Sequence, residues 1–323
     1  MGPEPNVMIE TKGLRKSFRG RKRTVEAVRS VDLTVREGEV FGFLGPNGAG
    51  KTTTLRMLTT LVEPDGGEAR IAGADLRRAP GEVRGRIGYV AQGGSTWGDV
   101  SAREELVYQA RLYGVGKAEA RERAERATHA FELEGFADRP CKTYSGGQRR
   151  RLDVALSVIH EPRVVFLDEP TTGLDPQSRT RMWDEVGRLR DEGMTVFLTT
   201  HYLDEADTLC DRIAIMDNGE IVAEGTPAEL KREITGDVVT VGLTAGAPEA
   251  AGLLELEPCV RKVETHDETL RLYVDAGATA LPRILRVLDA SGIAPDKIEL
   301  HRPSLDDVFL TKTGRTLRDT PVD

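Results

Sequence analysis

One segment of the sequence reads Gly45-Pro46-Asn47-Gly48-Ala49-Gly50-Lys51-Thr52 and matches the pattern G-x-x-x-x-G-K-[ST]. Residues 40–44, before it, are apolar and typical of a buried strand; residues 53–62, after it, carry leucines at helical spacing. In such a context the glycines let backbone N–H groups face a phosphate, and the helix N-terminus adds its positive dipole end. An accidental match in a glycine-rich turn is the alternative, and the flanking elements argue against it. The segment therefore predicts a nucleotide site, with Lys51 on the β- and γ-phosphates and the Thr52 hydroxyl on Mg²⁺.

Composition limits the remaining function classes. A length of 323 residues suggests about two domains, and 30% charged residues are typical of a globular protein. No apolar run approaches the ~18 residues of a membrane span, and residues 1–6 show no signal-peptide pattern. A net charge of −8 argues against a dedicated nucleic-acid binder. Three scattered cysteines indicate neither a disulfide framework nor a zinc site, so we expect reduced thiols.

The region before the glycine-rich loop reads as β-structure. Residues 7–10 and 25–28 are short strand candidates, and residues 31–35 alternate as a half-exposed strand does. Residues 19–23 form a basic turn between them. Just before this turn, Phe18 either stacks on adenine or belongs to the core.

The region after the loop begins as α/β and becomes helical. Residues 68–73 and 87–92 are strand candidates, and the second run ends in the polar amide of Gln92. Ser101 and Glu104 fit a capping box that opens a helix reaching about Tyr113. With the alanine-rich stretch that follows, residues 98–160 are predicted to be mostly helical.

A second glycine motif, Ser145-Gly146-Gly147-Gln148, precedes an apolar pattern of helical spacing. The motif is either a second anion-seeking helix N-terminus or simply a serine N-cap followed by a glycine turn. The arginine run at positions 149–151 is interpreted as a solvated helix face.

Acidic and imidazole groups follow two later strands. The strand at residues 164–167 ends in Asp168-Glu169, and the strand at residues 196–200 is followed by His201. Adjacent carboxylates at the end of an apolar strand are costly unless they meet a cation or a proton. In open α/β sheets the carboxyl ends of the strands are where ligands bind.

Taken together, these motifs resemble those of the ATP-binding subunit of an ATP-binding-cassette (ABC) transporter. The resemblance covers about residues 7–230 and rests on the glycine loop, Gln92, the Ser145 motif, the acidic pair, Gly173-Leu174-Asp175 and His201. It implies an α/β fold: a P-loop NTPase core with antiparallel β and helical subdomains at residues 1–235. The rest, residues 236–323, would be a small accessory α/β domain. Within it, Pro303-Ser304-Leu305-Asp306-Asp307-Val308-Phe309 resembles the tail of daunorubicin-resistance exporters.

The same resemblance implies roles within one site. Asp168 would hold Mg²⁺ with Thr52, and Glu169 would be the general base for the attacking water. His201 would contact the γ-phosphate, and Gln92 would sense Mg²⁺ and the attacking water. Lys51 would act in catalysis as well as binding. The nucleotide itself would contact Phe18 by stacking and Gly45, Pro46, Asn47, Gly48, Ala49, Gly50, Lys51, Thr52 and Thr53.

Further implied contacts cross to a second copy. Ser145, Gly146, Gly147 and Gln148 would close on ATP bound by the other subunit of a homodimer, and Asp175 would act at the same interface. Two departures from the family pattern stand out. Tyr144 replaces the commonest leucine, and residues 93–98 lack the usual apolar pattern of the segment that faces the membrane partner.

The resemblance implies ATP-driven export of a drug or hydrophobic natural product. A separate membrane permease would carry the cargo, and this subunit would lie on the cytoplasmic face of the membrane. The alternatives are an importer ATPase or a lipid or polysaccharide exporter with a regulatory C-terminal domain. A chromosome-maintenance ATPase is disfavoured because no sustained heptads separate Lys51 from Ser145. A non-catalytic scaffold is disfavoured because Glu169 and His201 are both present.

The tail has strand patterns at residues 237–243, 269–274 and 297–301, and a helical pattern in Leu281, Ile284, Leu285 and Leu288. Ser304 can cap a final short helix on which Leu305, Val308 and Phe309 share one face. This face either packs inside the tail or docks on the ATP-binding domain or its dimer mate.

Overall fold

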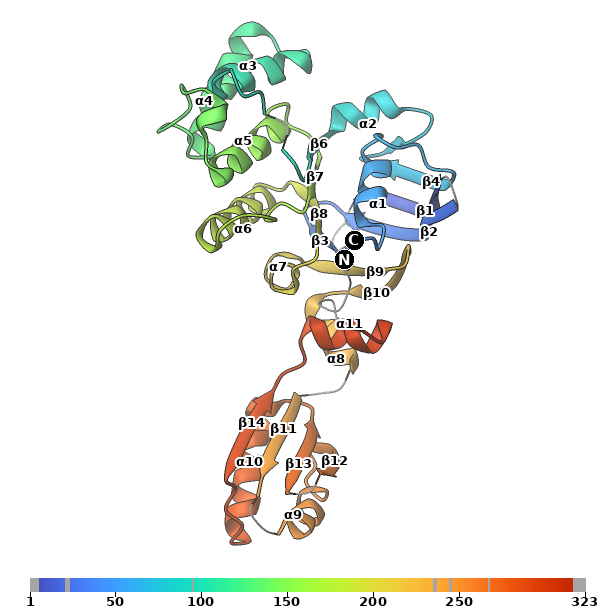
Figure 1. Ribbon diagram of the computed structural model, residues 1–323, viewed down its shortest axis with the longest axis vertical. Helices are drawn as coiled ribbons and strands as arrows, with labels where there is room; N and C mark the ends of the chain where they lie inside the picture. Colours follow the sequence, from blue (N-terminus) through green and yellow to red (C-terminus); the bar gives the residue numbers. More distant parts are fainter. Residues whose placement is uncertain are drawn as a thin grey trace. The chain divides into compact units, whose positions relative to one another are not determined.

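A computed structural model describes residues 6–20, 24–94, 96–234, 237–243, 246–266 and 268–315. The chain divides between Thr226 and Pro227 into two compact units, each of which is drawn in Figure 1. Part of the expected basic turn (residues 21–23), Ser95 and the expected domain boundary at residues 235–236 lie outside the described residues. Within the described ranges, no helix combines the length and apolarity that crossing a bilayer requires.

The first unit is built on a ten-stranded sheet in the order β5-β4-β1-β2-β10-β9-β3-β8-β7-β6. Five neighbouring strands, from β9 to β6 in that order, pair in parallel, whereas β5, β4, β1 and β2 pair antiparallel. The strand bounds are β1 Val7–Arg19, β2 Thr24–Arg36, β3 Val40–Leu44, β4 Gly66–Ile71, β5 Ala74–Asp75, β6 Ile87–Val90, β7 Val164–Asp168, β8 Thr195–Thr200, β9 Arg212–Asp217 and β10 Glu220–Gly225.

Burial explains this mixed architecture. Every residue of β3, β7 and β8 is buried, as expected for parallel strands with both faces covered. In β2, buried and exposed residues alternate toward its end, as in a sheet with one solvated face. The three short strands expected before the glycine loop are parts of two long paired strands, β1 and β2.

Helices flank the sheet and form a separate helical group (Figure 1). The group lies between β6 and β7 in sequence, and its capping box at Ser101 and Glu104 is confirmed. The helix after the glycine loop was expected to reach residue 62 but ends at Leu58, because the chain turns at Thr60, whose φ is 64°. The bounds are α1 Lys51–Leu58, α2 Pro80–Arg86, α3 Ala102–Leu112, α4 Lys117–Ala130, the 3₁₀ helix η1 Cys141–Thr143, α5 Gly146–Val158, α6 Pro176–Asp191 and α7 Leu203–Leu209.

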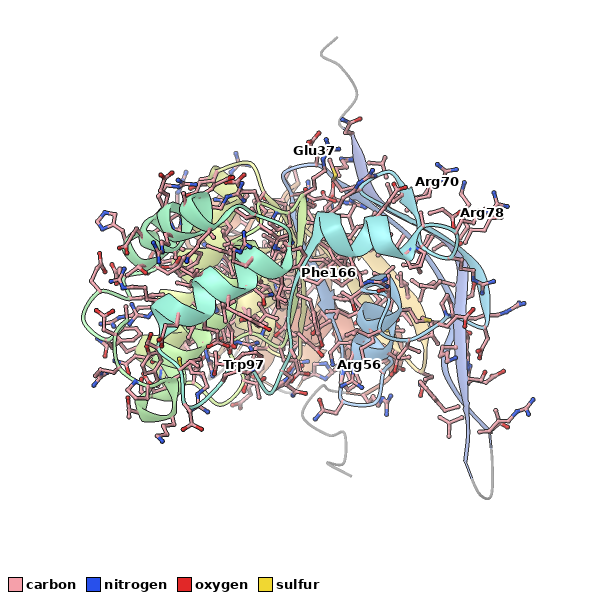
Figure 2. All side chains as sticks on the ribbon, turned by 90° about the horizontal axis from the view of Figure 1, so that it is seen from above. Glu37, Arg56, Arg70, Arg78, Trp97 and Phe166 are labelled. Atoms are coloured by element: carbon pink, nitrogen blue, oxygen red, sulfur yellow. The ribbon has the colours of Figure 1, made fainter. Side chains whose placement is uncertain are left out.

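An aromatic cluster holds the parallel strands in place. The ring of Phe197 on β8 lies 5.5–5.7 Å, between centroids, from those of Phe41, Phe43 and Phe166 on β3 and β7. All four side chains are fully buried, and Figure 2 shows Phe166 in the interior. Aromatic pairs at such distances add to the stabilisation from burial itself. The cluster therefore fixes strands whose carboxyl ends carry the glycine loop, the acidic pair and His201.

The second unit contains a four-stranded antiparallel sheet in the order β12-β13-β11-β14. The element order β-α-β-β-α-β with this strand order is the split βαβ, or ferredoxin-like, arrangement. The expected strands and the helix carrying Ile284 and Leu288 are confirmed, whereas α9 and β12 were not anticipated. The bounds are β11 Asp237–Gly242, α9 Ala247–Leu254, β12 Val260–His266, β13 Thr269–Val274, α10 Gly277–Ala290 and β14 Lys297–His301.

Two further helices, α8 (Pro227–Ile234) and α11 (Leu305–Thr313), pack against each other in this unit. Leu230 on α8 and Leu305, Val308 and Phe309 on α11 are all buried. The sequence analysis had placed the residues of α8 with the ATP-binding domain. In the structure they belong to the second unit because their apolar partner lies at its far end in sequence.

Replacing Phe309 by alanine is expected to destabilise the α8–α11 pair by roughly 3–5 kcal/mol, since it empties a fully buried aromatic site. Hydrogen exchange should then show loss of amide protection in both helices. Leu310→Ala, on the same helix but 44% exposed, is the matched control and should change the exchange little. Unchanged protection in Phe309→Ala would show that this side chain does not hold the pair together.

Candidate active site

The glycine-rich loop joins β3 to α1, as predicted. Gly50 is the N-cap of α1 with φ 106°, and an added Cβ would collide with the carbonyl oxygen of Ala27, so only glycine fits. The Lys51 ammonium is buried and donates hydrogen bonds to the carbonyl oxygens of Gly45 (2.7 Å) and Pro46 (2.9 Å). Burial lowers the pKa of Lys51, against the opposing effect of Glu169 and Asp168.

Asp168, at the end of β7, forms a cluster of oxygens with two hydroxyl groups. Its Oδ1 accepts hydrogen bonds from Thr52 Oγ1 (3.0 Å) and from Thr199 Oγ1 (2.7 Å). Its Oδ2 is buried and has no hydrogen-bond partner among the described residues. A buried carboxylate oxygen beside a hydroxyl is a suitable donor set for a hard cation such as Mg²⁺.

Side chains from the other motifs contact the carboxylate of Glu169. Its Oε2 accepts hydrogen bonds from Gln92 Nε2 (2.8 Å) and Thr172 Oγ1 (3.1 Å). His201 Nδ1 lies 3.4 Å from the same oxygen, and Lys51 Nζ lies 3.8 Å from Oε1. Burial would raise the pKa of Glu169, but the contacts with His201, Lys51 and Thr172 together lower it below its ordinary value. The group is therefore an ionised carboxylate at neutral pH.

The backbone of Glu169 is held in an uncommon conformation. Its φ is 45°, in the left-handed region that non-glycine residues seldom occupy. Its N–H donates to both the carbonyl and the hydroxyl oxygen of Thr199, at 3.2 Å and 3.0 Å. Strained residues of this kind persist only where their surroundings hold them, and they are frequent at active sites.

A cavity of about 630 Å³ opens onto these groups. Phe18 lines it and is 44% exposed, so the alternative that Phe18 belongs to the core is wrong. Most of the residues that the sequence analysis assigned to one nucleotide site are thus brought together. The lining comprises Phe18, Val25, Glu26, Ala27, Arg29, Asn47, Gly48, Gly50, Lys51, Thr52, Thr53, Gln92, Glu169 and Asn218.

The Ser145 motif does not line this cavity. Ser145 caps α5 by accepting from the Gln148 N–H (3.2 Å), and the Gln148 side chain accepts from the Ser145 N–H (3.0 Å). Gly147 packs on the first turn of α6: a Cβ added at Gly147 would lie 2.7 Å from Ser178 Oγ. Ser178 in turn donates to the N-cap residue Asp175. The Ser145 motif and Asp175 are therefore neighbours of each other, outside the cavity.

Two contacts were missed by the sequence analysis. Arg150 was expected on a solvated face, but it is 6% exposed and donates to backbone carbonyls at the carboxyl ends of β6 and β7, whereas Arg149 is exposed and Arg151 is partly buried. Consecutive residues of a helix point in different directions around its axis, so Arg150 faces the interior while Arg149 faces solvent. Thr199 was also not assigned a role. Its signal in the sequence was a hydroxyl next to the carboxyl end of β8, and the structure pairs it with Asp168 across the sheet.

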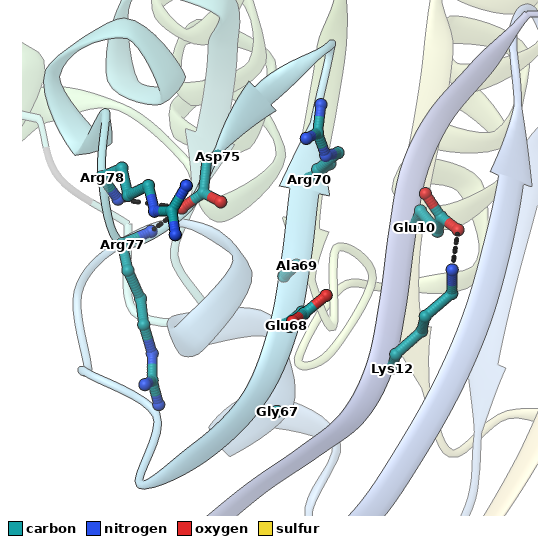
Figure 3. A pocket seen from close by; sticks show the side chains of 9 residues that line it. All are labelled: Glu10, Lys12, Gly67, Glu68, Ala69, Arg70, Asp75, Arg77 and Arg78. Atoms are coloured by element: carbon teal, nitrogen blue, oxygen red, sulfur yellow. Dashed lines mark hydrogen bonds and ion pairs between the residues drawn. The ribbon is translucent and has the colours of Figure 1, made fainter.

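A second cavity, of about 660 Å³, lies on β1, β4 and β5 and contains none of the motif residues (Figure 3). Lys12 pairs with Glu10 at 2.9 Å, and Asp75 Oδ1 accepts from the backbone N–H groups of Arg77 and Arg78. These contacts are an ion pair and an aspartate-capped turn on the sheet surface, and no phosphate-binding loop is among them. The cavity next to the glycine loop is therefore the candidate active site.

Comparison with known structures supports the fold of the first unit. A dimeric, post-hydrolysis ATP-binding cassette bound to ADP and Pi matches with a TM-score of 0.63 and 27% identity, over 68% of this chain and 98% of that one. The ATP-binding subunit of an ABC transporter matches with a TM-score of 0.61 and 28% identity, over 70% of this chain and 92% of that one.

Comparison with known sequences covers both units. Residues 28–172 match the family described as ABC transporter, and residues 225–313 match the C-terminal domain of DrrA1-3-like ATP-binding proteins. A daunorubicin/doxorubicin resistance ATP-binding protein of Streptomyces peucetius is 45% identical over 99% of this chain and 96% of its own. A Nod factor export ATP-binding protein of Ralstonia nicotianae is 40% identical over 99% of this chain and 97% of its own. The chain thus belongs to the ABC transporter ATP-binding proteins, ATP-hydrolysing transporter subunits, and carries the DrrA-like C-terminal domain.

Proposed function

We propose that this ATPase energises export of a drug or hydrophobic natural product through a separate membrane permease. The observation that carries the proposal is the near full-length similarity, at 42–45% identity, to daunorubicin and doxorubicin resistance proteins of Streptomyces. A linearmycin resistance protein of Bacillus subtilis, 33% identical over 97% of this chain, supports the same class of cargo. The similarity to Nod factor export proteins favours export as the direction and leaves a second cargo class as the alternative.

The geometry supports a division of roles within the site. The glycine loop and Lys51 would hold the phosphates, and Phe18 would stack on the adenine. Thr52 and Asp168 would hold Mg²⁺, which when bound supplies positive charge against the β- and γ-phosphates. Glu169 is an ionised carboxylate beside Gln92 and would take a proton from the attacking water. The water oxygen bonds to the γ-phosphorus as the bond to the bridging oxygen breaks, releasing ADP and phosphate.

A homodimer would complete this site. The N-terminus of α5, at Ser145 to Gln148, is an anion-seeking group that does not line its own cavity. We place it on the γ-phosphate of ATP bound by a second copy, with Asp175 at the same interface. One of the structural relatives is a dimeric cassette, in line with this arrangement.

The permease would dock at an apolar groove of about 320 Å³. The groove carries several exposed apolar side chains, among them Leu61 (59%), Trp97 (54%), Tyr108 (46%) and Leu112 (62%). Trp97 follows Gln92 along the chain and lies 5.0 Å from Tyr108, ring centroid to centroid. The apolar character that residues 93–98 lack is thus supplied largely by α3. Docking here would hold the subunit on the cytoplasmic face of the membrane.

Glu169→Gln is expected to lower turnover by roughly 10²–10⁴-fold with ATP affinity near wild type, because the carboxylate acts in the chemical step. Lys51→Ala should instead lose ATP binding, since it removes a direct phosphate contact. Steady-state ATPase assays and ATP titrations separate the two effects. Glu185→Gln, a largely buried carboxylate on α6 outside the cavity, is the control. Wild-type turnover in Glu169→Gln would refute the base assignment.

The rate of hydrolysis per subunit is expected to rise with protein concentration, because each site needs a second copy. Ser145→Arg should abolish turnover and leave ATP binding near normal. Ser101→Arg is the matched control: it removes the capping box of α3 rather than that of α5 and should keep turnover. A rate per subunit that does not change with concentration would contradict the dimer.

Transport itself can be tested in inside-out vesicles that contain a candidate membrane permease. ATP should drive daunorubicin from the medium into such vesicles when the wild-type subunit is added, and the Glu169→Gln subunit should not support uptake. The measurement is drug fluorescence in the vesicle lumen. ATP-driven movement in the opposite direction would favour the importer alternative.

A further inference from the structure

Arg150 is a buried cation that connects two parts of the first unit. It lies on α5, three residues after Gly147 and so within about one helical turn of it. Its side chain leaves the helical group and reaches the carboxyl ends of β6 and β7. Only 6% of the residue is exposed.

Each nitrogen of its guanidinium donates to a different backbone carbonyl. Nη1 donates to Ala91 (2.6 Å), Nη2 to Asp168 (3.0 Å) and Nε to Pro170 (2.8 Å). Ala91 immediately precedes Gln92, and Asp168 and Pro170 flank Glu169. The guanidinium therefore joins the two backbone segments whose side chains form the Gln92–Glu169 hydrogen bond.

This arrangement requires arginine rather than any other cation. A planar guanidinium presents donors in a rigid fork, whereas a lysine ammonium is a single point with flexible geometry. Burying a cation is costly unless its hydrogen bonds are satisfied and opposite charge is near. Here each of the three nitrogens donates to one carbonyl, and the carboxylates of Asp153, Asp168 and Glu205 contribute favourable charge.

We propose that Arg150 is a positioning residue that couples the N-terminus of α5 to the chemistry of the chain's own site. A shift of Gly147 against a second copy would move Arg150 with it, because both lie on the first turns of one helix. Arg150 would pass that shift to the carbonyls beside Gln92 and Glu169 and so set their alignment on the attacking water. The inference rests on the proposed role of Glu169 as the base.

The neighbouring Arg151 lies on the same helix, but its hydrogen bonds do not reach the site. It also donates to backbone carbonyls, those of Phe131 (3.4 Å) and Glu132 (3.1 Å), and its side chain is 12% exposed. These carbonyls belong to the helical group and flank no motif residue. Arg151 also pairs with the Glu132 carboxylate (3.3 Å), and it is the control for residue type and helix.

The test is the kinetics of Arg150→Met, Arg150→Lys and Arg151→Met in the full chain. Arg150→Met should lower kcat by up to about 10²-fold, as a small misplacement of catalytic groups does, with KM for ATP nearly unchanged. Arg150→Lys keeps the charge but not the fork and should recover only part of the rate. Arg151→Met should keep the wild-type kcat even where its melting temperature falls.

Results from these variants and from Glu169→Gln decide the inference. Wild-type kcat in Arg150→Met would overturn the inference, as would an equal fall of kcat in Arg151→Met at similar loss of stability. If Arg150→Met does not fold, full activity of Arg150→Lys overturns the inference and a selective loss of kcat supports it. Glu169→Gln is measured alongside: normal turnover there refutes the proposed base, whereas loss there with normal turnover in the Arg150 variants refutes only the coupling.

Discussion

Two adjacent carboxylates at the end of one buried strand are the constraint on which this site depends. Asp168 and Glu169 are 1% and 7% exposed, a position that is costly for charges without partners. Their partners come from separate elements: Thr52 from α1, Thr199 from β8 and Gln92 from the segment after β6. The need to satisfy these two groups therefore brings together motifs that are distant in sequence.

The apolar core makes this convergence possible. Phe41 and Phe43 on β3, Phe166 on β7 and Phe197 on β8 pack around one point, so the three strands keep a common register. Their carboxyl ends then lie side by side, which is where ligands bind in parallel sheets. The left-handed backbone of Glu169 is held by the hydrogen bonds of its N–H to Thr199, so the core and the strained residue are parts of one arrangement.

The helical group adds a second level of organisation. Its motif at Ser145 to Gln148 does not line the chain's own cavity, while Arg150, about one turn later, donates to the backbone carbonyls beside Gln92 and Glu169. The proposed dimer would need communication between the contact with its mate and Glu169, the proposed base. In our proposal Arg150 provides this connection, since its single side chain joins α5 to the backbone on both sides of the Gln92–Glu169 hydrogen bond.

The sequence by itself determined the features that depend on neighbouring residues. The glycine loop with its strand and helix, the capping box at Ser101 and the serine N-cap at Ser145 all follow from local patterns, and the hydrogen bonds of both caps close within a few residues. Only the tertiary structure decided which arginine of positions 149–151 is buried, that Phe18 lines a cavity, and that α8 pairs with α11. These outcomes depend on which surface of a helix or strand meets another element far away in sequence, and neither spacing nor composition specifies that direction.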